Sequence, residues 1–90
     1  MRAAKVDKNQ SEIVQALRKS GVSVLHLHMV GKNAPDILCG FRSENYLMEL
    51  KSGKAQPTEG QIKWHQEWRG NVFVIRTVEE ALDAIGVNDD

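Results

Sequence analysis

The sequence predicts a single small α/β domain in which a central mixed β-sheet is flanked by helices. Three observations lead to this prediction. The chain has 90 residues, 41% of them hydrophobic, which is enough for one modest core, so residues 1–90 are expected to form one domain. Apolar residues recur at helical spacing near both ends, and short apolar strand-like runs lie between them. The resulting order is helix, three strands, helix, strand, helix (αβββαβα), which favours a mixed sheet.

The first element is a helix whose start and stop are both marked in the sequence. Asn9 or Ser11 can cap its N-terminus, and Gly21 supplies the residue that ends it. Its apolar positions are expected to face inward and are Ile13, Val14 and Leu17.

Three strands are predicted to follow. Residues 22–30 form a β-branched and leucine-rich run, which predicts one long strand. Pro35 has no N–H to donate to a sheet, so it belongs at the start of the second strand. The apolar runs at residues 37–41 and 46–48 then form a hairpin around a turn at residues 42–45.

Two capping boxes predict the remaining helices. The box at residues 58–61 opens a helix that runs to about Arg69, and the box at residues 77–80 opens a closing helix that stops at Gly86. Residues 72–76 between them form a short buried strand.

The hairpin brings two acids and a lysine together. With a two- or four-residue loop, residues whose numbers sum to 87 lie opposite, so Asp36 faces Lys51 and Leu38 faces Glu49. Because side chains alternate between the faces of a strand, Asp36, Glu49 and Lys51 share one face at one end of the hairpin.

These residue types suit phosphodiester hydrolysis. Mg²⁺ prefers oxygen ligands and keeps several of its waters, so Asp36 and Glu49 can bind it, with the Leu50 carbonyl as a third ligand. Lys51 can orient or deprotonate the attacking water, or neutralise the phosphate. The alternative is that Glu49 and Lys51 form an ion pair on a solvated sheet.

The net charge of zero hides an uneven distribution. All twelve Lys and Arg residues lie between Arg2 and Arg76, together with seven acids, so this part carries a charge of about +5. The other five acids lie in the last helix and tail. A basic body favours a polyanionic partner such as DNA.

Targeting signals are not expected. No apolar run is long enough to span a membrane, and no apolar segment follows the first residues. Cys39 has no partner for an internal disulfide and is expected to be a small buried hydrophobe. These features predict a cytoplasmic protein, with virus-encoded origin left open.

The chain resembles a standalone, phage-type VRR-NUC domain, a branch of the PD-(D/E)XK nuclease superfamily. The resemblance covers nearly the whole chain from Glu12 onward and rests on residues 35–37, 46–51, 61, 64 and 74–81. One departure is Asn33-Ala34, where a glycine nearer the proline is expected.

The resemblance implies a set of site residues and a cofactor. Such domains bind Mg²⁺ or Mn²⁺ and cut DNA, often at branched structures. Their motif positions correspond here to an acid on the first helix, a Pro-Asp, a Glu-x-Lys and a helical glutamine, namely Glu12, Asp36, Glu49, Lys51 and Gln61.

Several of these residues also have ordinary structural interpretations. Glu12 can complete an N-terminal cap, and Gln61 occupies the third position of a capping box. Gln61 lies on one helical face with both tryptophans, which favours a position near the site. Trp64 and Trp68 are expected to be core residues rather than platforms for base stacking.

The remaining polar candidates are histidines and lysines. The three histidines are predicted to be ordinary strand or interface residues, because no further ligand falls at zinc-binding spacing. Three lysines are candidates for phosphate contacts beside the site, and Lys54, in the polar loop at residues 52–57, is the best placed. The three histidines are His26, His28 and His65, and the three lysines are Lys32, Lys54 and Lys63.

Three functions remain in view. The leading hypothesis is a metal-dependent DNA endonuclease that acts on branched or four-way junction DNA as a homodimer, because one small domain offers a single active site. The alternatives are a nucleic-acid-binding module of the same fold that does not cleave, and a structural protein without a nucleic-acid partner.

Overall fold

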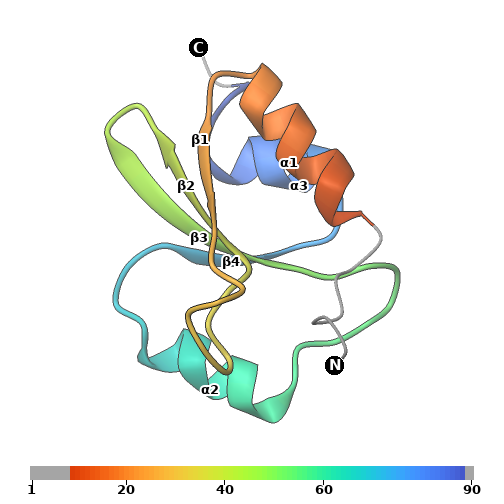
Figure 1. Ribbon diagram of the computed structural model, residues 1–90, viewed down its shortest axis with the longest axis vertical. Coiled ribbons are helices and arrows are strands. Elements are labelled where there is room, and N and C mark those ends of the chain that lie inside the picture. The colour runs from red at the N-terminus through yellow and green to blue at the C-terminus, as the bar shows by residue number, and fades with distance from the viewer. Residues whose placement is uncertain (1–8, 89–90) are drawn as a thin grey trace.

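A computed structural model describes residues 9–88 of the chain. Within these residues, seven elements follow the predicted order (Figure 1). They are α1 (Gln10–Lys19), β1 (Ser23–His26), β2 (Ile37–Phe41), β3 (Glu44–Leu50), α2 (Glu59–Glu67), β4 (Val72–Ile75) and α3 (Val78–Ala84). The basic residues Arg2, Lys5 and Lys8 counted above lie outside the described range. Between residues 9 and 88, no helix is long and apolar enough to cross a membrane.

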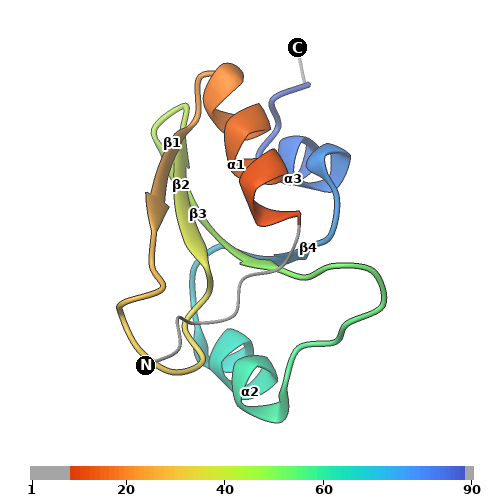
Figure 2. The same cartoon turned by 45° about the vertical axis from the view of Figure 1, so that its right-hand side comes forward.

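The four strands form one mixed sheet in the order β1-β2-β3-β4. The first two pairs are antiparallel, and β4 runs parallel to β3 after a crossover through α2. Helices α1 and α3 lie side by side, whereas α2 lies apart from them near the opposite end of the sheet (Figures 1 and 2). The predicted fold class is therefore confirmed.

The core lies between the sheet and the helix pair α1 and α3. Its fully buried members include Ile13 and Leu17 of α1, which are both 0% exposed, as predicted from their spacing. Alternate residues of β2 and β3, such as Ile37 and Met48, meet them from the sheet. The residues between these, including Asp36 and Glu49, consequently point to the other face of the sheet.

The first strand is shorter than predicted. β1 ends at His26 instead of residue 30, because the chain turns back at residues 28–30, where the Val30 N–H donates to the Leu27 carbonyl (2.9 Å). Within residues 9–88, the apolar side chains of this turn are left largely uncovered, and Val30 is 67% exposed. Met29 is 85% exposed, so burial gives this segment no reason to stay extended.

The hairpin register differs from the prediction by two residues. Leu38 lies opposite Leu47, not opposite Glu49, because the turn consists of Arg42 and Ser43 alone. Both turn residues have positive φ (51° and 69°), the geometry of a tight two-residue hairpin. A shift of two preserves the face of every side chain, so the predicted grouping on one face survives.

Helix ends agree with the sequence in most places. Thr58 and Gln61 form the predicted capping box, and Gly21 has the positive φ (87°) typical of a helix stop. Helix α2 ends at Glu67, two residues before the predicted end, because the backbone of Trp68 is extended. Asn9 precedes α1, but its side chain makes no capping hydrogen bond.

Candidate metal centre

Asp36 and Glu49 lie opposite each other at the ends of adjacent strands. Asp36 directly precedes β2, and the register that pairs Ile37 with Met48 continues to bring Asp36 opposite Glu49. The Asp36 N–H donates to the Met48 carbonyl (3.0 Å), so the backbone there is still part of the sheet. Two carboxylates therefore meet on one face, as predicted, although Asp36 does not face Lys51.

The Asp36 carboxylate is fixed by a backbone donor. Its Oδ2 accepts a hydrogen bond from the Leu50 N–H at 2.6 Å, a short distance typical of a charge-assisted bond. The Leu50 side chain is 0% exposed in the core, so this donor cannot easily shift. One Asp36 oxygen is thus held by β3.

The Glu49 carboxylate is almost fully buried, with 2% of the residue exposed. Among residues 9–88, three side chains that approach it are Gln61, Lys51 and His65. Gln61 Nε2 donates to Oε2 (3.1 Å), Lys51 Nζ lies 3.9 Å from the same oxygen, and His65 Nε2 lies 3.8 Å from Oε1. A buried charge is costly unless such groups surround it, and here an amide, an ammonium and an imidazole do so.

Gln61 has two roles at the start of α2. Its Oε1 accepts from the Thr58 N–H (2.9 Å) and completes the capping box, while its Nε2 donates to Glu49. The capping interpretation of Gln61 is therefore confirmed, and the same side chain also contacts the Glu49 carboxylate, while its role in a functional site stays a prediction.

Lys51 is the first residue after β3, and its backbone links three parts of the site. Its N–H donates to the Ile75 carbonyl (3.0 Å), and its carbonyl accepts from Asn9 Nδ2 (3.1 Å). Asn9 Nδ2 also donates to the Arg76 carbonyl (2.7 Å), and its Oδ1 accepts from Ser52 Oγ (3.2 Å). Asn9 thus ties the start of α1 to the ends of β3 and β4, a role that capping analysis missed.

His65 is the second residue whose place the sequence analysis missed. Its side chain is 15% exposed, and its buried Nε2 points toward Glu49 without a hydrogen bond to any described residue. Burial lowers the pKa of this imidazole below its usual value, which favours the neutral form. The available signal was its position four residues after Gln61, on the same face of α2.

The other predicted site residues are not brought into contact with this pair. Glu12 is exposed on the first turn of α1, and no three Asp, Glu, His or Cys side chains cluster as metal ligands anywhere in residues 9–88. The lysines proposed for phosphate contacts are all exposed. Lys32 lies on the loop after β1, Lys54 on the loop after β3 and Lys63 on α2.

The two tryptophans do not form a core, contrary to the prediction. No residue of α2 is fully buried, and Trp68 is 47% exposed. Trp64 and Trp68 instead stack on each other, with ring centroids 5.0 Å apart and an angle of 16° between the planes. Ile62 of α2 is also 46% exposed, so the apolar side chains of this helix are left partly open to solvent.

The donor set fits a hard divalent cation. Two carboxylates on neighbouring strands provide the oxygen ligands that Mg²⁺ and Mn²⁺ accept, and Mg²⁺ commonly binds one or two carboxylates while keeping several waters. A cation between Asp36 and Glu49 would also offset the cost of placing two acids opposite each other.

Comparison with known proteins identifies the fold. The sequence matches no family model and no curated protein. One solved structure, described as a VRR_NUC domain, aligns with 86% of this chain and 94% of its own, with a TM-score of 0.68 and 24% sequence identity. The protein therefore has the fold of a VRR_NUC domain.

Proposed function

We propose that this protein is a Mg²⁺- or Mn²⁺-dependent DNA endonuclease that hydrolyses phosphodiester bonds. The observation that carries the proposal is the pairing of Asp36 and Glu49 on one face of the hairpin, with Gln61 bonded to Glu49 and Lys51 beside it. The basic body of the chain and the VRR_NUC fold support the same conclusion.

Each residue has a role that follows from its contacts. Asp36 and Glu49 would hold the cation, and the Leu50 N–H fixes the orientation of the Asp36 carboxylate. The cation, when bound, supplies water activation and charge neutralisation at the phosphate. Lys51 would orient or deprotonate the attacking water or neutralise the phosphate, and Gln61 would hold Glu49 in its binding geometry.

Further ligands and contacts are part of the proposal. Glu12 on α1 and the Leu50 carbonyl would complete the metal coordination. The exposed lysines at positions 32, 54 and 63 would contact the DNA backbone on either side of the cleaved bond.

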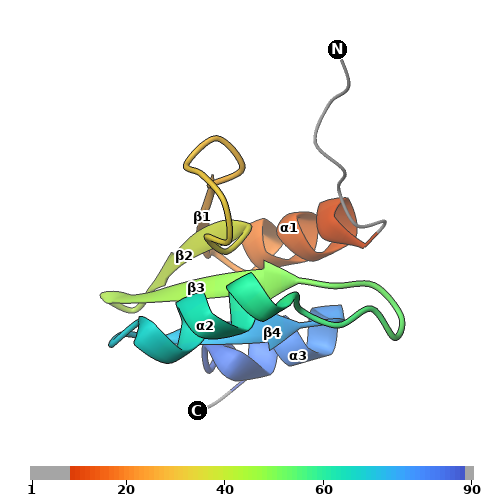
Figure 3. The same cartoon turned by 90° about the horizontal axis from the view of Figure 1, so that it is seen from below.

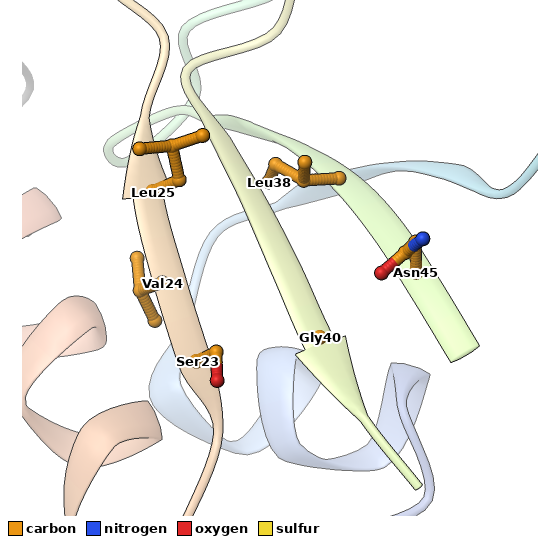
Figure 4. A pocket seen from close by; sticks show the side chains of 6 residues that line it. All are labelled: Ser23, Val24, Leu25, Leu38, Gly40 and Asn45. Atoms are coloured by element: carbon orange, nitrogen blue, oxygen red, sulfur yellow. The ribbon is translucent and has the colours of Figure 1, made fainter. Parts of the chain in front are cut away.

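We further propose that the working unit is a homodimer that prefers branched DNA, including four-way junctions. A two-fold dimer presents two active sites in opposite polarity, which matches the symmetry of a junction. The outer face of β1 and β2 supports this proposal, because Leu25 is 58% exposed and lies beside Leu38 in a shallow apolar pocket (Figure 4). The stacked tryptophans on α2 are the alternative interface.

The competing function is a DNA-binding module that does not cleave. A cleavage assay separates the two hypotheses. Purified protein is incubated with a four-way junction and with a linear duplex of the same sequence, with Mg²⁺, with Mn²⁺ and with EDTA. Metal-dependent cleavage of the junction is expected, whereas binding without cleavage in both metals would establish the non-catalytic alternative.

Matched variants test the site itself. Asp36→Asn, Glu49→Gln and Lys51→Ala should each abolish cleavage while circular dichroism shows a folded protein. Glu44→Gln is the control, because Glu44 is an exposed acid at the first position of the same strand, β3. Near-normal activity in any of the three site variants would show that the assignment is wrong.

The dimer is tested separately by light scattering. Leu25→Asp should convert a dimer to a monomer and reduce the preference for junctions. A wild-type protein that is monomeric at micromolar concentration and cuts linear and branched DNA equally would refute the dimer proposal.

A further inference from the structure

The loop at residues 27–34, which follows β1, places two apolar side chains in solvent. Met29 is 85% exposed and Val30 is 67% exposed, the two most exposed large hydrophobic residues among those described. Figures 2 and 3 show this loop projecting beyond the ends of β1 and β2, in the orange-yellow part of the chain. Because Met29 and Val30 are consecutive in the chain, they form one small apolar tip on this loop.

The base of the loop is closed at the metal centre itself. The Leu27 N–H donates to the carbonyl of Asp36 at 2.9 Å, so the segment between them leaves and returns to the sheet at the residue proposed to bind the cation. The tip is a tight turn, closed by the hydrogen bond from Val30 to Leu27 (2.9 Å). Met29 and Val30 therefore lie in a turn whose first residue, Leu27, is hydrogen-bonded directly to Asp36.

The far side of the loop rests on α2. Asn33 has a positive φ of 69° and lies against Gly60 of α2. A Cβ atom added at Gly60 would be only 2.6 Å from Asn33 Oδ1, so the two residues are in close contact. The loop is thus supported at Asp36 and at the first turn of α2, the helix that also carries Gln61.

The chemistry around the tip favours nucleic acid as its partner. His28 and Lys32 are exposed beside Met29 and Val30, so the tip combines apolar groups with a nearby positive charge. Two side chains are far too small a surface to hold a protein partner, which needs roughly 800 Å² on each side. They are the right size to insert between bases, as apolar wedges do in proteins that kink DNA.

We propose that Met29 and Val30 form a wedge that stacks against the bases at the branch point of branched DNA and sets the junction in position for cleavage. The inference rests on the proposed nuclease function. It identifies the residues that would select branched DNA over linear DNA. A branch point interrupts the continuous duplex, and unstacking costs least where a base is mismatched or already single-stranded.

The test uses four-way junctions that carry 2-aminopurine at the branch point, with Ca²⁺ in place of Mg²⁺ so that the DNA stays intact. Wild-type protein should raise the 2-aminopurine fluorescence several-fold. The double variant Met29→Ser/Val30→Ser should lose this rise and bind the junction about tenfold more weakly, while its affinity for linear duplex changes less than twofold. Ile62→Ser, which removes an exposed apolar side chain from α2, is the matched control and should behave as the wild type.

Two results would overturn the wedge. One is an undiminished fluorescence rise with the double variant. The other is conversion of a dimer to a monomer by the double variant, because Met29 and Val30 would then cover a second copy of the chain. The fluorescence readout does not require cleavage, so an inactive protein that still unstacks the bases would refute the nuclease function and leave the wedge standing.

Discussion

Gln61 offers the sharpest test of how the site is built, because its side chain makes two different hydrogen bonds. Gln61→Ala removes both the acceptor for the Thr58 N–H (2.9 Å) and the donor to Glu49 (3.1 Å). Thr58→Ala removes only the other half of the same capping box, the bond from the Gln61 N–H to Thr58 Oγ1 (3.2 Å). Comparison of the two variants isolates the contribution of the contact with Glu49.

The expected magnitudes follow from these contacts. Loss of an N-cap side chain costs about 1 kcal/mol, which is the expected effect of Thr58→Ala. A hydrogen bond to a charged group contributes about 1.5–3 kcal/mol, and Gln61 is only half-buried, so the lower end applies. Gln61→Ala should therefore lower the free energy of unfolding by about 2 kcal/mol, which for a domain of this size corresponds to roughly 8–16 °C in Tm.

Gln61→Glu is the informative third variant. It keeps an acceptor for the Thr58 N–H but places a second carboxylate against Glu49, so at pH 7 it should also be destabilised.

The assay is urea denaturation of the metal-free proteins, followed by tryptophan fluorescence. Both Gln61 variants should lose more stability than Thr58→Ala. If Gln61→Ala is no more destabilising than Thr58→Ala, the contact between Gln61 and Glu49 contributes nothing, and the reasoning about the site is refuted.

Four further predictions concern the rest of the molecule. Asn9→Ala removes three side-chain hydrogen bonds and should cost about 2–3 kcal/mol in urea denaturation, whereas Gln15→Ala, on the exposed side of the same helix, should cost less than 1 kcal/mol. Burial raises the pKa of the Cys39 thiol to about 11, so a thiol reagent at pH 8 should modify Cys39 only after unfolding, and rapid reaction with the native protein would contradict its burial. Burial lowers the pKa of His65, so the unfolded state takes up the proton more readily, and Tm should fall as the pH drops below about 6.5 by more in the wild type than in His65→Phe. Ca²⁺ should support DNA binding with little cleavage, because its larger and looser coordination shell positions water and phosphate poorly, and equal rates in Ca²⁺ and Mg²⁺ in a gel assay would refute this.

The order of elements could be predicted because its signals are local. The capping box of Thr58 and Gln61 and the glycine stop at Gly21 each depend on a few neighbouring residues, and the structure has both. The grouping of Asp36 with Glu49 was also predictable, since the faces of a hairpin depend only on whether the register is odd or even.

The register itself was not predictable with the same certainty. Arg42 and Ser43 both adopt positive φ, although neither is the Asn or Gly that usually signals such a turn. The early end of β1 had no local marker either, because Leu27 and Met29 continue the alternation of a strand. In the described part of the chain, Met29 is 85% exposed, so burial does not extend the strand beyond His26.

The contacts that complete the site depend on how distant elements dock. Asn9 binds the ends of β3 and β4, 42 and 67 residues away in the sequence. His65 on α2 approaches Glu49 on β3 (3.8 Å), a contact that depends on how the helix docks against the strand. Spacing along a helix shows which residues share a face, but not which part of the sheet this face meets.

The central claim is that Asp36 and Glu49 together hold a divalent cation for DNA cleavage. The most direct measurement is a titration with Mn²⁺ followed by electron paramagnetic resonance, on the wild type, Asp36→Asn, Glu49→Gln and the control Glu44→Gln. Saturable binding is predicted for the wild type and the control, at concentrations that also support cleavage, and it should be lost in both site variants. Unchanged Mn²⁺ binding in Asp36→Asn and Glu49→Gln, or DNA cleavage by the wild type in EDTA, would contradict the claim.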